Sequence, residues 1–284
     1  MERVAAKRLQ QPMGDEEPYP KPCTADARCS IAPDRRKIGV FYADVSSSSH
    51  DLRCLAEFLP EEERDRSNRL VFRHDKNAFI AAHALLRYGL LWITGSTDWQ
   101  IRNGELGKPE LVPVGDGPVP SFNLSHTRGL AAVAVCLGRE VGIDAEAVNQ
   151  DFAFEEIVAT HFGPSEQAEL AAYDGTARVE AFFRLWTLKE ALLKATGYGL
   201  SRPLTHIIVK LEPLSIIVCS NCSERHAWQI RQRKLTGSHW CSLAFQQDST
   251  DVIFVEWHAV SVDTICAALN RVSCNKIRSR CSVL

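Results

Sequence analysis

The sequence predicts an α+β fold that consists of two αβ blocks, residues 38–140 and 141–260. Stretches with the two-residue period of a strand occur in both blocks beside stretches with the 3.6-residue period of a helix. The composition, with 45% apolar and 24% charged residues, is that of an ordinary globular protein. A chain of 284 residues is long enough for one large domain or two smaller ones.

Charge and hydropathy exclude several other classes of protein. The 33 Lys and Arg residues nearly balance the 35 Asp and Glu residues, so we expect no nucleic-acid partner. No apolar run reaches the roughly 18 residues that a membrane-spanning helix needs. The first eight residues lack the apolar segment of a secretory signal. We therefore expect a soluble, cytoplasmic monomer whose ten cysteines are mostly thiols.

The first block follows an extension without apolar periodicity. Residues 1–37 mix five prolines with scattered charge, so they should remain flexible. The elements expected next are a strand at Ile38–Ala43, a helix that starts at Phe58–Pro60 before three glutamates, a helix over Asn77–Trp92, a half-buried strand at Ser121–Ser125 and a buried strand at Leu130–Leu137.

The second block begins with a strand at Val141–Glu146, after a turn at Gly138–Glu140. The helices expected next are Phe154–Phe162, Ser165–Ala172 and Val179–Thr196, the last ended by Gly197. The β-rich runs that follow are Ile207–Leu211, Ile216–Val218, Ala227–Ile230, Cys241–Phe245 and Val252–Trp257. Residues 261–284 show one weak helical period and are expected to form a basic tail.

Two carboxylates of the second block share one face of its first strand. Asp144 and Glu146 are two residues apart, so their side chains point to the same side. A hard divalent cation such as Mg²⁺, which binds one or two carboxylates together with phosphates and water, would relieve their repulsion. An isolated Asp-x-Glu pair is more often an ordinary solvated strand end, so the neighbouring segments must decide between the two interpretations.

A carboxylate and an ammonium group are one turn apart in the helix expected at Val179–Thr196. Glu190 and Lys194 project from the same face, where they would suit a metal ion and a phosphate oxygen. The common structural alternative is a surface ion pair. His126 follows the half-buried strand and would donate to an anionic ligand or to a local acceptor. Gly104–Pro109 lacks the spacing of a nucleotide-hydrolase phosphate loop.

Four segments, in order, resemble the signature of the 4′-phosphopantetheinyl transferases of the Sfp-like group. They are Gly104–Pro109, Phe122–Thr127, Val141–Glu146 and Phe183–Gly197, and the resemblance extends over about residues 38–210. It implies two similar αβ subdomains in a pseudo-twofold arrangement. It also implies a holo-[acyl-carrier-protein] synthase, which transfers the 4′-phosphopantetheine arm of coenzyme A to a serine of an apo carrier protein and releases adenosine 3′,5′-bisphosphate.

The resemblance also implies roles for individual residues. Asp144, Glu146 and Glu190 would bind Mg²⁺ against the pyrophosphate, and Lys194 would contact the phosphate being transferred. Glu190, or a water that it holds, would accept the proton of the serine. Other phosphates of coenzyme A would be held by Lys108, Ser125 and His126. The candidates for its 3′-phosphate are Arg69, Arg73 and Lys76, along with Arg64, Arg66 and Arg87.

Two weaker patterns suggest other sites. Cys219, Cys222, His239 and Cys241 would assemble into the zinc site of a non-enzymatic binding module, although the Ser-Asn between the first two favours a hairpin turn. Cys281–Leu284 fits a C-a-a-X prenylation box, so a membrane partner is expected only if Cys281 is prenylated. The surface that selects the carrier protein is not a local motif, so the sequence does not name that partner.

Overall fold

The computed structural model describes residues 34–46, 52–113, 115, 117–199, 203–219, 227–247 and 252–281. Side chains are described for these residues except 218, 219, 227 and 275–281. The first 33 residues of the expected extension, Cys222 and the last three residues of the C-a-a-X box lie outside the described residues.

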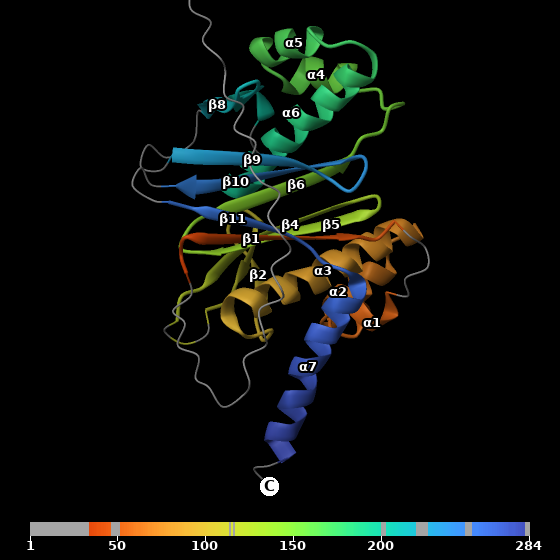
Figure 1. Cartoon of the computed structure of the whole chain (residues 1–284), viewed down its shortest axis with the longest axis vertical. Helices are drawn as coiled ribbons and strands as arrows, with labels where there is room; N and C mark the ends of the chain where they lie inside the picture. The colour runs from red at the N-terminus through yellow and green to blue at the C-terminus, as the bar shows by residue number, and fades with distance from the viewer. Residues whose placement is uncertain are drawn as a thin grey trace, which may run out of the picture. The chain divides into compact units, whose positions relative to one another are not determined.

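The first sheet has four strands in the order β11-β1-β5-β4. Strand β1 (Lys37–Asp44) pairs with β5 (Leu130–Leu137), which pairs with β4 (Pro120–Thr127), and both pairings are antiparallel. Strand β11 (Phe254–Ala259) joins β1 in parallel. The chain therefore returns to the sheet of its first half after it has built the second sheet (Figure 1).

The second sheet has three antiparallel strands in the order β6-β10-β9. These strands are β6 (Val141–Ala147), β10 (His239–Gln247) and β9 (Ala227–Leu235). Two short hairpins accompany the sheets and consist of β2 (Ile101–Asn103) with β3 (Pro109–Leu111), and β7 (Ile207–Leu211) with β8 (Leu214–Cys219).

Each sheet carries one long helix on its outer face. Helix α3 (Arg73–Thr94) packs on the first sheet and α6 (Gly175–Thr196) on the second, and each has 22 residues. Both helices end at a left-handed glycine, Gly95 and Gly197, which adopts this conformation without a Cβ penalty. The other helices are α1 (Arg53–Ala56), α2 (Glu61–Asn68), α4 (Glu155–His161), α5 (Pro164–Ala171), the 3₁₀ turn η2 (Leu204–His206) and α7 (Val262–Cys281).

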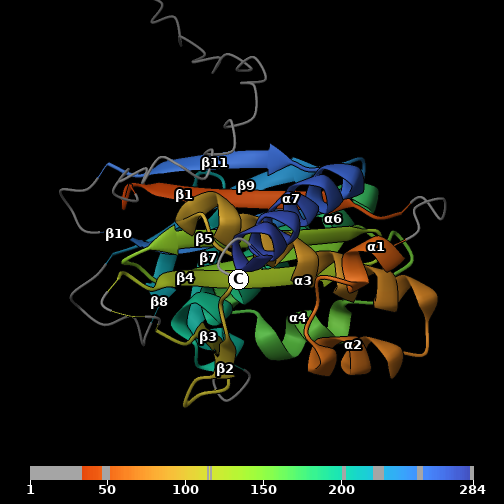
Figure 2. The ribbon, with the colours of Figure 1, turned by 90° about the horizontal axis from the view of Figure 1, so that it is seen from below.

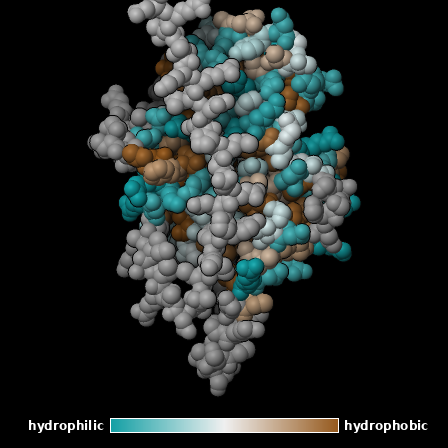
Figure 3. Space-filling model, in the orientation of Figure 1, coloured by the Kyte–Doolittle hydropathy of each residue, from teal (hydrophilic) through white to brown (hydrophobic). Residues whose placement is uncertain are grey.

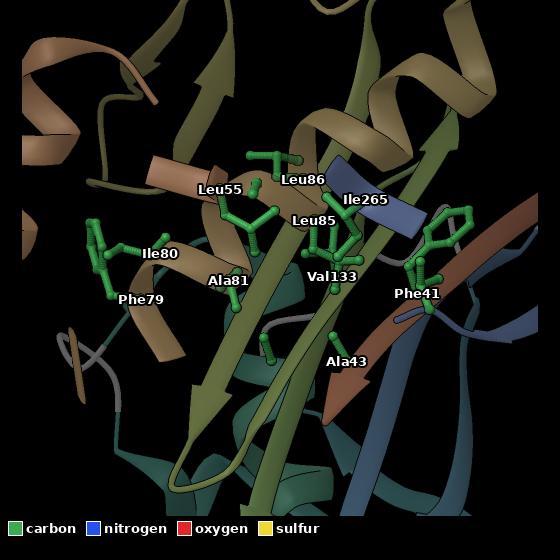
Figure 4. Packing of buried hydrophobic residues seen from close by; sticks show 14 of the residues in the cluster. Phe41, Ala43, Leu55, Phe79, Ile80, Ala81, Leu85, Leu86, Val133 and Ile265 are labelled. Atoms are coloured by element: carbon green, nitrogen blue, oxygen red, sulfur yellow. The ribbon is translucent and has the colours of Figure 1, made fainter. Parts of the chain in front are cut away.

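Three apolar clusters hold these layers together. The first lies between α3 and the first sheet, where Phe41, Leu85 and Val133 meet Ile265 of α7 (Figure 4). The second lies between α6 and the second sheet. The third lies between the two sheets and includes Ile38 of β1 and Ile143 of β6. All eight residues of β5 are buried because both faces of that strand are covered.

The structure confirms the α+β class and the order of the predicted elements. Helix α3 starts four residues before the predicted Asn77, because its first turn is polar and shows no apolar period. The short strands β2 and β3 and the helix α1 were not predicted. The expected tail contains α7, whose Val262, Ile265 and Leu269 are buried against the first half of the chain, where α7 crosses α3 (Figure 2).

One pair of cysteines departs from the thiol state that is expected for most of them. Cys54 of α1 and Cys266 of α7 form a disulfide, with 6.5 Å between their Cα atoms. Both helices pack near α3, which brings together two residues that are 212 positions apart in the sequence. Cys136 and Cys241 are buried thiols, and Cys274 is an exposed thiol.

None of the described helices is long and apolar enough to cross a membrane. On the face of the described residues seen in Figure 3, hydrophilic side chains predominate and hydrophobic ones form small patches between them.

Candidate active site

Four of the predicted site residues lie where the two sheets adjoin, Ser125 and His126 on β4 and Asp144 and Glu146 on β6. No backbone ladder joins these strands; instead, side chains of β4 accept hydrogen bonds from the backbone of β6. Asn123 Oδ1 accepts from the amide of Ile143 at 2.9 Å, and Ser125 Oγ accepts from the amide of Ala145 at 3.2 Å. The polar side chains of β4 therefore satisfy buried amides and also face the carboxylates of β6.

Asp144, Ser125 and Lys194 form the centre of the site. Lys194 Nζ lies 2.6 Å from Asp144 Oδ1, and Ser125 Oγ donates to the same oxygen at 3.0 Å. Lys194 Nζ also donates to Ser125 Oγ at 3.2 Å. The structure thus joins residues from β4, β6 and α6. The other oxygen of Asp144, Oδ2, is buried and has no hydrogen-bond partner among the described residues.

Glu146 and Glu190 lie within electrostatic range of Asp144, although the three carboxylates are not gathered into a metal-holding group among the described residues. Thr127 Oγ1 donates to Glu146 Oε2 at 2.9 Å. Burial and the charge of Asp144 raise the pKa of Glu146 to about 7, although Thr127 and Lys194 oppose the shift. Burial and Asp144 also raise the pKa of Glu190. The three carboxylates therefore repel one another, and a cation among them would favour their charged forms.

The close packing of α6 on β6 brings the helix residues to the strand residues. A Cβ atom at Gly142 would overlap the backbone of α6 at Ala191 and Ala195. Only glycine permits this approach, and it lies on the same face of β6 as Asp144. Ser242 of β10, which pairs with Asp144 of β6, is buried and hydrogen-bonded to Thr187 of α6 at 2.8 Å. Sequence reasoning assigned no role to Gly142 or Asn123.

His126 lies at the end of β4 near aromatic and basic groups of α3. Its ring centroid is 6.1 Å from that of Phe79, which stacks on His83 at 4.1 Å and lies under the Arg66 guanidinium at 5.5 Å. Desolvation by the surrounding protein lowers the pKa of His126, and the charges of His83 and Lys194 lower it further. Of the predicted basic candidates, Arg66 is therefore the one that these contacts connect to His126.

The other candidates for the 3′-phosphate are distributed around the junction of α2 and α3. Arg69 and Arg73 are exposed, and Lys76 Nζ donates to Asn68 Oδ1 at 2.7 Å. Arg87 is buried, with its guanidinium 3.0 Å from Glu63. The assignments of Arg69, Arg73 and Lys76 remain predictions.

Lys108 contacts protein groups at the end of α6 and the start of β6. Its ammonium group donates to Ala195 O at 3.0 Å and to Val141 O at 3.2 Å, and it pairs with Glu140 at 2.6 Å. These contacts use the three donors of a lysine. They also place a positive charge at the carboxyl end of α6, where the helix dipole favours it. The predicted contact of Lys108 with a phosphate remains a prediction.

Comparison with known proteins supports the interpretation that this geometry suggests. The pattern of the 4′-phosphopantetheinyl transferase superfamily matches residues 140–244. The 4′-phosphopantetheinyl transferase HetI of Nostoc sp. is 36% identical over 167 residues, which cover 57% of this chain and 69% of HetI. The chain belongs to the 4′-phosphopantetheinyl transferase family. The resemblance to the Sfp-like group is thereby confirmed, and so is the class of enzyme.

A further sequence relative agrees with the family. The 4′-phosphopantetheinyl transferase Sfp of Bacillus subtilis is 28% identical over 177 residues, 62% of this transferase and 76% of Sfp. A holo-(acyl-carrier-protein) synthase from Bacillus anthracis, solved in complex with CoA (3′,5′-ADP), has a TM-score of 0.34 and 17% identity. The superposed region covers 39% of this chain and 96% of that synthase. The family assignment rests on the sequence relatives.

The zinc alternative finds no support in the described part of the transferase. Cys241 is fully buried in the apolar cluster between the sheets, where burial raises the pKa of its thiol. His239 lies close to two backbone carbonyls instead. No group of three or more His, Cys, Asp or Glu side chains that could hold a metal occurs among the described residues. Cys222 lies outside them.

Sequence reasoning also missed a buried ion pair next to Glu190. Lys189 and Glu166 are both 0% exposed, and Lys189 Nζ lies 2.7 Å from Glu166 Oε2. The same ammonium donates to Ile207 O. This pair connects α5, α6 and the start of β7, so it fixes the helix that carries Glu190 and Lys194. A lysine beside a glutamate in a helix carries no local signal of burial.

Proposed function

We propose that this transferase moves the 4′-phosphopantetheine arm of coenzyme A to a serine of an apo carrier protein, with Mg²⁺ as its cofactor, and releases adenosine 3′,5′-bisphosphate. The observation that carries the proposal is the contact of Lys194 with both Asp144 and Ser125 at the junction of β4, β6 and α6. Three segments of the family resemblance supply these three residues.

The carboxylates of the site fit a divalent cation. Asp144 Oδ2 is a buried acceptor without a hydrogen-bond partner among the described residues, and the pKa values of Glu146 and Glu190 are raised in part by the charge of Asp144. The described residues do not form a preformed cage of three ligands. Mg²⁺ typically binds one or two carboxylates and completes its shell with phosphate oxygens and water. When bound, Mg²⁺ would neutralise charge on the pyrophosphate.

Each remaining residue of the site then has a role that its position supports. Lys194 would hold an oxygen of the phosphate being transferred and stabilise its developing charge. Ser125 and His126 would donate to other phosphates of coenzyme A. Glu190, or a water that it holds, would accept the proton of the carrier serine as the serine oxygen attacks phosphorus.

The proposal is tested by incubating the purified protein with coenzyme A, Mg²⁺ and a panel of apo carrier proteins, followed by intact-mass measurement. We expect a carrier to gain the mass of one phosphopantetheine group, and adenosine 3′,5′-bisphosphate to form in equal amount. EDTA should stop the gain, and added Mg²⁺ should restore it. If no carrier gained mass under any of these conditions, the proposed function would be wrong.

The monomeric state and the cytoplasmic location remain predictions, and light scattering of the purified protein tests the first of them. The sequence names no carrier, and the panel assay would identify one.

A further inference from the structure

The imidazole of His239 lies between two turns of the chain. Its Nε2 atom is 2.9 Å from the carbonyl oxygen of Arg128, in the turn between β4 and β5. Its Nδ1 atom is 3.1 Å from the carbonyl oxygen of Thr236, in the turn between β9 and β10. The side chain is buried. Both carbonyl oxygens can only accept, so a neutral ring donates to one of them and a protonated ring to both. With its proton on Nε2, the atom at the shorter of the two distances, the ring donates to Arg128 and connects β10 to the turn between β4 and β5.

The turn between β4 and β5 directly follows residues of the candidate active site. His126 and Thr127 directly precede Arg128, and Thr127 Oγ1 donates to Glu146 Oε2 at 2.9 Å. The next carbonyl of the turn, that of Gly129, accepts from the amide of Val45 at 2.9 Å. Two successive carbonyls of the turn thus contact protein groups outside it, His239 at the start of β10 and the amide of Val45 just after β1.

We infer that His239 is a positioning residue for the carboxylate site of this transferase. By holding the carbonyl of Arg128, it fixes the turn in the place where the Thr127 hydroxyl reaches Glu146. Groups hydrogen-bonded to a metal ligand, as Thr127 is to Glu146, typically contribute about 10–100-fold to metal affinity or activity, and His239 acts one contact further out, so we expect its effect at the lower end of that range. The inference rests on the proposed function, because it takes Glu146 as a ligand of Mg²⁺.

The test replaces His239 by phenylalanine, which fills the space without a donor, and by glutamine, which retains one donor. His161→Phe, at an exposed position at the end of α4, is the matched control. Three quantities are measured for each full-length variant: the affinity for Mn²⁺ in the presence of coenzyme A, the amide hydrogen exchange of residues 127–131, and the Mg²⁺ concentration that gives half-maximal transfer.

We expect His239→Phe to weaken Mn²⁺ binding about tenfold, to raise the half-maximal Mg²⁺ concentration similarly and to speed exchange in the turn. His239→Gln should restore part of each property, and the control should behave as the wild type. The inference would be overturned if His239→Phe kept the Mn²⁺ affinity and the hydrogen-exchange rates of the turn found in the wild type. This holds even if the variant had a lower melting temperature.

If the phenylalanine variant does not fold, the same two measurements on His239→Gln decide the question. A wild-type protein that transfers nothing to any carrier would refute the proposed function. In that case the Mn²⁺ affinity and the hydrogen exchange would still decide the role of His239.

Discussion

Replacing Lys189 by methionine should destabilise the fold strongly, because it leaves the Glu166 carboxylate buried without its cation. Lys189 Nζ lies 2.9 and 2.7 Å from the two oxygens of Glu166, and both side chains are 0% exposed. Glu166 also accepts from the amides of Gly163 at 2.8 Å and Val209 at 3.0 Å. These amides hold the carboxylate in place, so it cannot turn toward water when the lysine is removed.

The expected loss is about 3–5 kcal/mol of unfolding free energy, the usual cost of removing one partner of a buried pair. For a protein of this size it corresponds to a fall of roughly 6–20 °C in melting temperature. The assay is urea unfolding followed by circular dichroism, combined with a thermal scan. The double variant Lys189→Met/Glu166→Gln should recover part of the loss, because it no longer buries an unpaired charge.

The matched control is Lys234→Met, which removes an ammonium group from an exposed ion pair. Lys234 Nζ lies 2.8 Å from Glu180, and the two side chains are 44% and 35% exposed. Exposed pairs contribute about 0–1 kcal/mol, so the control should change stability little. A loss below about 1 kcal/mol for Lys189→Met, equal to that of the control, would refute the reasoning.

Two further predictions concern the packing around the site, and a third concerns the disulfide between α1 and α7. Gly142→Ala should lower the free energy of unfolding by about 1–3 kcal/mol and lower the transfer rate, because the new methyl group meets the backbone of α6. Thermal unfolding and initial transfer rates test this. Lys108→Met should lower the free energy of unfolding by about 1.5–3 kcal/mol, because Lys108 bonds carbonyls of α6 and β6. An unchanged melting temperature with a higher KM for coenzyme A would favour the phosphate role instead. Reduction by dithiothreitol should lower the free energy of unfolding of the oxidised wild type by about 2–5 kcal/mol and should leave that of Cys54→Ser unchanged. An equal loss in both proteins would contradict the disulfide between Cys54 and Cys266.

The local features of the site could be predicted from the sequence because they depend on short-range geometry. Alternation along β6 places Asp144 and Glu146 on one face whatever the fold, and the 3.6-residue period does the same for Glu190 and Lys194. The left-handed glycine at the end of α6 was recognised for the same reason.

The remaining features depend on contacts between distant parts of the chain. The pairing of β11 with β1 requires the chain to return to its first sheet, and no local pattern records that return. The burial of Lys189 depends on Glu166 of another helix. Asn123 continues the alternation of its strand, so its bond to the amide of Ile143 follows only from the side-by-side course of β4 and β6.

The central claim is that Asp144 and Glu190, which come from a strand and a helix, serve one Mg²⁺-dependent reaction. The most direct test measures Mg²⁺-dependent phosphopantetheine transfer and thermal unfolding together for Asp144→Asn, Glu190→Gln and the exposed control Glu156→Gln of α4. Both site variants should remain folded, because an amide keeps the shape and relieves repulsion, and both should transfer orders of magnitude more slowly than the control. If Asp144→Asn and Glu190→Gln were folded and as active as the control, the two carboxylates would have no part in the reaction and the proposed site would be wrong.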